Sequence, residues 1–113
     1  MRYDIHDPEV TVTPQIEKIV AEKLAKLDER LKSYHPEAAR LEMRLRRQEK
    51  KQLLSCALTL HAYQEELHVE KEAVELREAV DRAFDALFRE VEHYRARINK
   101  SLQSDNKRNA GAS

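Results

Sequence analysis

The chain has 113 residues with 21 basic and 21 acidic side chains, so its formal net charge at pH 7 is zero. This length predicts one domain with a modest core, and the zero net charge argues against non-specific binding of polyanions, which depends on neutralising phosphates. A single glycine, Gly111, excludes glycine-rich phosphate loops, and a single cysteine, Cys56, excludes an intrachain disulfide.

The first third of the chain predicts a strand and then a helix. Residues 1–6 alternate between apolar and polar side chains, which is the period of a half-exposed strand. Thr13 and Pro14 predict a helix start, because threonine caps helices well and proline suits the first helical position. The helix is expected to end near Ser33, and its apolar stripe, spaced by three and four, consists of Ile16, Ile19, Val20, Leu24, Leu27 and Leu31.

The middle of the chain changes to a period of two and predicts three strands. Residues 39–46 and 54–62 alternate, and the polar residues 47–51 between them predict a hairpin turn. A turn at 64–66 precedes a short third strand around residues 67–69. Each strand is apolar on one face only, so two helices are expected to cover that face.

The last predicted helix begins near Val74 and carries two stripes. One is apolar at helical spacing and is expected to be buried. The other is cationic and lies to one side at 100° per residue; it consists of Arg82, Arg89, His93, Arg97 and Lys100. A lateral row of cations in a chain without a catalytic motif favours a nucleic-acid partner. Residues 103–113 are small and polar, and we expect a disordered tail after a domain at 1–102.

Charge is segregated along the chain although its sum is zero. Residues 39–51 carry +4, from six bases and two acids, and residues 65–81 carry −5, from two bases and seven acids. Segregated charge orients a protein on a partner of mixed charge. The basic hairpin is predicted as an additional RNA contact, although charged turns and outward arginines equally keep a sheet soluble; its cations are Arg44, Arg46, Arg47, Lys50 and Lys51.

No residue pattern predicts catalysis, a cofactor or a metal site. The five histidines and Cys56 lack metal-ligand spacing, although His61 and His68 are expected to lie opposite each other on the outer face of the last two strands. Cys56 is expected to be a buried thiol. The acidic residues at 65–78 fit a solvated surface better than acid–base chemistry. Without an apolar run of ~20 residues, a signal-peptide core or a disulfide, a soluble cytoplasmic protein is expected.

Two stretches and the order of the elements carry a resemblance to a known family. They are MRYDIHDPEVTVTPQIEKIVAEKLAKLDERL at 1–31 and ALTLHAYQEELHVEKEAVELREAVDRAFDALFREVEHYRARINK at 57–100, which includes Ala79-Val80-Asp81. Together they resemble the ribosome hibernation-promoting factor / ribosome-associated inhibitor family of bacteria and plastids, also called the sigma-54 modulation protein family. The resemblance covers roughly residues 1–102 and implies a short member without the C-terminal domain that pairs ribosomes.

The resemblance implies an α+β fold of order β-α-β-β-β-α, similar to the double-stranded-RNA-binding domain, with two helices on one face of a four-stranded sheet. It implies a stress-associated translation inhibitor that contacts 16S rRNA of the small ribosomal subunit near the decoding centre and blocks the tRNA and mRNA sites. It involves no cofactor, membrane or small-molecule substrate. Carried over by position, the rRNA-binding residues are Lys23, Lys26, Arg30, Arg82, Arg89, His93, Arg95, Arg97 and Lys100.

The sequence also departs from the family pattern, which keeps an alternative open. Ala86, Glu90, Glu92 and His93 stand where the family commonly has lysine, glutamine or arginine, and each lost cation predicts weaker attraction to phosphate. Tyr94 and Arg77 likewise replace a common histidine and a common tyrosine. The alternative is a protein-interaction module on the same fold, with a second copy of the chain among its candidate partners. The choice between 30S and 70S ribosomes stays open.

Overall fold

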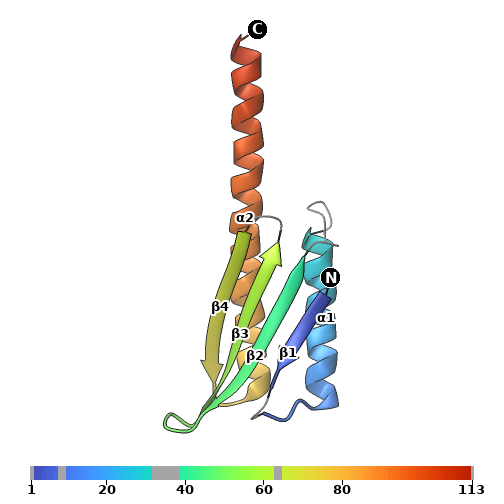
Figure 1. The fold of residues 1–113 in the computed structure, drawn as a ribbon, viewed down its shortest axis with the longest axis vertical. Helices are drawn as coiled ribbons and strands as arrows, with labels where there is room; N and C mark the ends of the chain where they lie inside the picture. The colour runs from blue at the N-terminus through green and yellow to red at the C-terminus, as the bar shows by residue number, and fades with distance from the viewer. Residues whose placement is uncertain (1, 8–9, 32–38, 63–64, 113) are drawn as a thin grey trace.

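The computed structural model describes residues 2–7, 10–31, 39–62 and 65–112, with side chains described as far as Arg97. One four-stranded sheet has the order β1-β2-β3-β4. β1 pairs with β2 in parallel, and the other two pairs are antiparallel (Figure 1). The elements are β1 (Arg2–His6), α1 (Pro14–Leu31), β2 (Arg40–Gln48), β3 (Leu53–Ala62), β4 (Glu65–Ala73) and α2 (Leu76–Ala112).

The predicted cap at the start of α1 is confirmed. The backbone N–H of Ile16 donates to Oγ1 of Thr13 at 3.3 Å, and the N–H of Glu17 donates to the Thr13 carbonyl at 3.0 Å. The first bond satisfies an N–H group that has no backbone partner in the first turn, and the second is the first hydrogen bond of the helix itself. The predicted end near Ser33 lies outside the described residues. A parallel β1–β2 pair needs a crossover, and α1 provides it.

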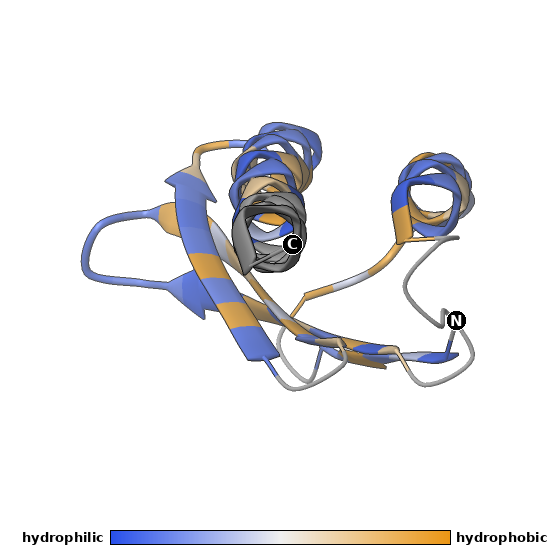
Figure 2. Cartoon of the chain, turned by 90° about the horizontal axis from the view of Figure 1, so that it is seen from above, coloured by the Kyte–Doolittle hydropathy of each residue, from blue (hydrophilic) through white to orange (hydrophobic). Residues whose placement is uncertain are grey.

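Both helices lie on the same face of the sheet, as the alternation of the strands predicts (Figure 2). The apolar sides of the helices and the inner face of the sheet form one core. Phe84 and Leu87 of α2, Leu27 of α1, and Leu41 and Leu58 of the sheet are all fully buried. The predicted α+β fold with two helices on one face is therefore confirmed.

The strands are longer than the apolar pattern predicts. β4 covers nine residues, Glu65–Ala73, because each of them pairs with β3, from Ala62 to Leu54. Backbone hydrogen bonds between strands do not require apolar side chains, so the polar ends of β4 stay in the ladder. β2 likewise includes Arg47 and Gln48, which were predicted as turn. The turn occupies residues 49–52, with Gln52 at a φ of 53°.

α2 begins at Leu76 and remains helical to Ala112, beyond the end of the sheet (Figure 1). The composition predicts that the helix ends near Leu102 and that a disordered tail follows. Residues 103–110 contain neither proline nor glycine, the two residues that most disfavour a helix, so nothing in this stretch breaks it. As far as the described residues go, neither α1 nor α2 offers the apolar length that crossing a bilayer requires.

The predicted burial of Cys56 is confirmed, since it lies on the inner face of β3 with no exposed surface. Burial in the core, and then the negative charge of Glu70, raise the pKa of the Cys56 thiol from its ordinary value of 9.0 to about 12. The thiolate is the reactive form of cysteine, so burial suppresses reactivity both by access and by ionisation.

We therefore expect Cys56 to resist Ellman's reagent at pH 8 in the native protein and to react fully in urea. Between pH 9 and about 12 the unfolded thiol loses its proton and the folded thiol keeps it, so the free energy of unfolding falls as the pH rises through this window. Absorbance at 412 nm follows the reaction, and complete reaction of the native protein within seconds would contradict the buried position.

Candidate nucleic-acid interface

The cations of α2 separate into two groups because the helix lies over the sheet with a different neighbour on each side. One group faces β4, the edge strand that packs against α2. The other group faces α1. The buried apolar stripe fixes the rotation of the helix, so each charged residue is held on one of these two sides.

On the β4 side, Arg82 and Arg89 of α2 approach Lys71 of β4. Together with Asp85 and Ala86 they line a shallow hollow of about 220 Å³. Lys71, Arg82 and Arg89 are all exposed and form what we call the basic edge. Three cations around one hollow, with a single carboxylate among them, make a site suited to a phosphate group.

Sequence reasoning missed Lys71, which it counted only as one base in an acidic segment. The signal was present, because Lys71 follows Leu67 and Val69 at the period of two that marks the inner face. The structure pairs Lys71 with Cys56, an inward position of β3. Since β4 is an edge strand, a lysine at that position reaches solvent beside α2 instead of entering the core.

Two cations of the predicted stripe also attach α2 to β4. Nη1 of Arg82 donates to the backbone carbonyl of Glu72 at 3.1 Å, and Nη2 of Arg97 donates to Oε2 of Glu65 at 2.8 Å. The first bond occupies a carbonyl group of the sheet edge, which would otherwise be open to pairing with another strand. Of Arg82, Arg89 and Arg97, Arg89 alone forms neither an ion pair nor a side-chain hydrogen bond with the described residues, so it is the arginine of the stripe most available to a partner.

On the α1 side, one carboxylate joins the two helices. Oε1 of Glu92 accepts from Nη1 of Arg30 at 2.5 Å and from Nη1 of Arg95 at 3.2 Å. The guanidinium of Arg30 also lies 5.0 Å from the centre of the Phe88 ring, within the range of a cation–π contact. We call Arg30, Phe88, Glu92 and Arg95 the interhelix seam. In it the Glu92 carboxylate neutralises two of the predicted rRNA-binding residues, Arg30 and Arg95.

A weaker ion pair extends the same neutralisation along the helices. Nζ of Lys23 lies 3.9 Å from Oδ1 of Asp81, and Nε of Arg77 lies 4.0 Å from Oδ2 of the same carboxylate. Of the other predicted residues, Lys26 and His93 are exposed. The side chain of Lys100 lies outside the described residues.

The hairpin cations do not extend the basic edge. Arg44 and Arg46 lie on the outer face of the sheet, since their neighbours Met43 and Leu45 are buried on the inner face. They therefore point away from both helices. The predicted additional RNA contact is divided between the outer face and the hairpin tip, and it does not form one surface with the cations of α1 and α2.

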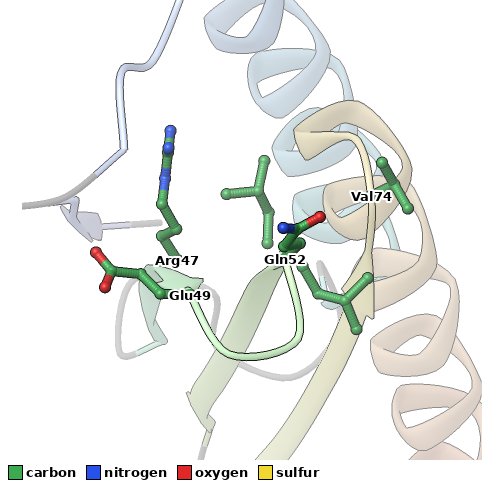
Figure 3. Close-up of a pocket in the computed structure, with 6 residues that line it drawn as sticks. Arg47, Glu49, Gln52 and Val74 are labelled. Atoms are coloured by element: carbon green, nitrogen blue, oxygen red, sulfur yellow. The ribbon is translucent and has the colours of Figure 1, made fainter.

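The hairpin tip borders a second hollow, of about 370 Å³, at the end of the sheet. Figure 3 shows Arg47 and Glu49 on one side of it and Val74 on the other, with Gln52 between them. Val74 is 71% exposed, which is high for an apolar side chain. Of the two lysines in the turn, Lys51 reaches back to within 3.9 Å of a carboxylate oxygen on β4.

The histidines are arranged differently from the prediction. Both His61 and His68 lie on the outer face, but His68 pairs with Thr59 and His61 pairs with Glu66. Nδ1 of His68 lies 2.8 Å from Oγ1 of Thr59. β4 begins at Glu65, before the predicted start near Leu67, and His68 therefore lies two residues along β4 from the position opposite His61. Within the described part of the chain, no three His, Cys, Asp or Glu side chains are grouped to hold a metal ion.

The two positions of α2 that face β4 and solvent give a testable contrast. We expect Arg82→Ala to lower the free energy of unfolding by about 0.5–1.5 kcal/mol, because it removes a hydrogen bond to the Glu72 carbonyl. Arg89→Ala also removes an exposed arginine of α2, but Arg89 forms no hydrogen bond or ion pair with the described residues. This substitution should change the free energy of unfolding by less than about 0.5 kcal/mol. Urea titration followed by circular dichroism measures both; equal losses would contradict the assigned contact.

Comparison with known proteins gives a family and a fold. Residues 3–99 match the family model described as Sigma 54 modulation protein / S30EA ribosomal protein. The N-terminal domain of Thermus thermophilus Protein Y has a TM-score of 0.67 at 24% identity, covering 83% of this chain and 99% of that chain. A ribosomal subunit interface protein from Coxiella burnetii has a TM-score of 0.64 at 12% identity, covering 85% and 99%. At these identities the two structures show the fold alone, and no curated protein matches the sequence.

Proposed function

Because this chain belongs to the sigma 54 modulation protein / S30EA ribosomal protein family, we propose that it is a ribosome-binding hibernation factor. It binds the small subunit, contacts 16S rRNA near the decoding centre and blocks the sites of tRNA and mRNA in the cytoplasm of stressed cells. The observation that carries the proposal is the basic edge, where Lys71, Arg82 and Arg89 from two elements surround one exposed hollow. The family description names a ribosomal protein and no enzymatic activity.

The proposed mechanism is steric occlusion and requires no chemistry at the site. Cations of the basic edge contact phosphates, and the folded body fills the space that tRNA and mRNA need. Phosphate contacts position a protein on RNA without reading sequence, and the deep groove of A-form RNA offers side chains little to read. Recognition therefore depends on the shape of the rRNA surface and on the spacing of its phosphates.

The ion pairs of the free protein oppose this binding. Glu92 holds Arg30 and Arg95, and Glu65 holds Arg97. Each of these arginines has to exchange a carboxylate for a phosphate before it adds to RNA affinity. Exposed ion pairs contribute little to stability, so the exchange costs little, but the carboxylate that is left remains beside the phosphate and repels it. We therefore expect the affinity for rRNA to depend on the carboxylates of Glu92 and Glu65 as well as on the cations.

The central test reverses the charge of the basic edge. Lys71→Glu with Arg89→Glu should reduce co-sedimentation with 30S subunits at least tenfold at low salt. It should also lower the slope of log K against log salt concentration by roughly two, about one for each lost phosphate contact. Neither side chain forms an ion pair with the described residues, so the fold should be kept, which circular dichroism checks.

The matched control makes the same change of charge elsewhere. Arg2→Glu with Lys18→Glu replaces two exposed cations of β1 and α1 that lie outside the basic edge. It should leave most of the binding in place. Undiminished, stoichiometric co-sedimentation of the Lys71→Glu, Arg89→Glu variant would rule out the basic edge as the ribosome-binding surface.

The interhelix seam gives a second test with the opposite sign. Glu92→Gln should raise the affinity for 30S subunits several-fold, since it removes the negative charge that pairs with Arg30 and Arg95. Glu90→Gln changes the net charge equally on the same helix, and Glu90 forms no ion pair with the described residues. Filter binding across a salt series compares the two variants. Equal gains would show that only net charge matters and that the seam does not restrain its arginines.

A further inference from the structure

The outer face of the sheet carries a groove that the proposed ribosome-binding function does not use. Among the described residues no helix covers this face (Figure 2), which lies opposite α1 and α2. The groove has a volume of about 450 Å³ and runs over β3, where the small side chains of Ser55, Ala57 and Thr59 form its floor. Longer side chains of β2 and β4 form its two walls. The charges along these walls are segregated, because the β2 wall is mainly basic and the β4 wall is mainly acidic.

The strand register places these charges in matching rows. Arg44 of β2 and Glu70 of β4 both pair with Ala57, so they face each other across one β3 residue. The same relation joins Arg46 to Glu72 across Ser55, and Arg40 to Glu66 across His61. In the remaining row, Glu42 faces His68 across Thr59. Three of the four rows thus have an arginine on the β2 wall and a glutamate on the β4 wall.

We propose that this face binds a second copy of the chain through a twofold axis that runs along β3. This axis lies between the two facing sheets and is parallel to β3. Rotation about it places β2 of one copy opposite β4 of the other, and each row of one copy faces the same row of its partner. Arg44 then meets the partner's Glu70, and Glu70 meets the partner's Arg44. An isologous interface requires this kind of self-complementary surface, in which each contact occurs twice.

The row of Arg44 and Glu70, which we call the central row, is available for such a contact. Both side chains are exposed, and neither forms an ion pair with the described residues. The outer rows are partly engaged within the chain, since Arg40 lies 3.1 Å from Glu42, and Gln48 donates to Glu72 at 3.0 Å. The central row of Arg44 and Glu70 therefore contributes most to the specificity for a second copy, because its charges are complementary to the same row of the partner.

The area of the face predicts a weak dimer. Strands of nine residues at about 3.4 Å each, over three strands about 4.8 Å apart, give a face of about 30 by 15 Å. The two copies together bury roughly 900 Å², which is below the size of stable interfaces. Association should therefore appear only at high protein concentration and should weaken as salt increases. The basic edge lies on the other side of the sheet, so this dimer is independent of the proposed function.

The experiment is sedimentation velocity of the full chain over a concentration series at low salt. We expect the weight-average mass of the wild type to approach twice the monomer mass at the highest concentrations. Arg44→Glu and Glu70→Arg should each remain monomeric, because each places like charges opposite each other in both copies of the central row. Lys18→Glu makes the same change of charge as Arg44→Glu on an exposed site of α1 and should dimerise like the wild type.

An equimolar mixture of the two single variants distinguishes the proposal from an effect within one chain. In a mixed dimer, Glu at 44 meets Arg at 70 in one contact and the original Arg44 meets the original Glu70 in the other, so the mixture should dimerise although neither variant does alone. A wild type that stays monomeric at every concentration overturns the proposal. A mixture that stays monomeric, with both variants folded by circular dichroism, overturns it as well.

Discussion

The packing of α2 on the inner face of the sheet is the constraint on which the other features depend. Phe84, Leu87 and Val91 are fully buried along one side of the helix, so the helix cannot rotate without exposing them. This fixes Arg82 and Arg89 toward β4 and Glu92 toward α1. The surface chemistry of the protein therefore follows from the core, since a residue next to the apolar stripe has only one direction in which to point.

The edge strand β4 connects this core to the candidate site. Its inner side supplies Lys71 to the basic edge, and its backbone and Glu65 accept bonds from Arg82 and Arg97. Its outer side supplies the acidic wall of the groove over β3. β4 thus lies between the cationic basic edge on its inner side and the acidic wall of the groove on its outer side. This arrangement explains how a chain with zero net charge presents two surfaces of opposite character.

Carboxylates decide how strongly the cations act. The arginines of α2 look like one attractive surface in the sequence, but Glu92 and Glu65 accept hydrogen bonds from two of them, Arg95 and Arg97. Glu92 also accepts a hydrogen bond from Arg30 of α1. Charge that is already neutralised contributes less to the release of counterions, which is the main source of RNA affinity. In the proposed function, the affinity for RNA therefore depends on these local ion pairs more than on the number of basic residues.

The sequence alone determined the fold class, the order of the elements and the direction of most side chains. Periods of two and of three to four report which side of an element is buried, and the Thr13 cap and the inward Cys56 follow from such local rules. The sequence could not determine the ends of β4 or the end of α2, because backbone pairing and helix continuation do not depend on apolar residues. Only the tertiary structure joined Lys71 to Arg82 and Arg89, separated Arg44 from the helix cations and placed Glu92 between Arg30 and Arg95. These are contacts between elements far apart in the chain, and they are decided by strand register and helix rotation, which no local pattern encodes.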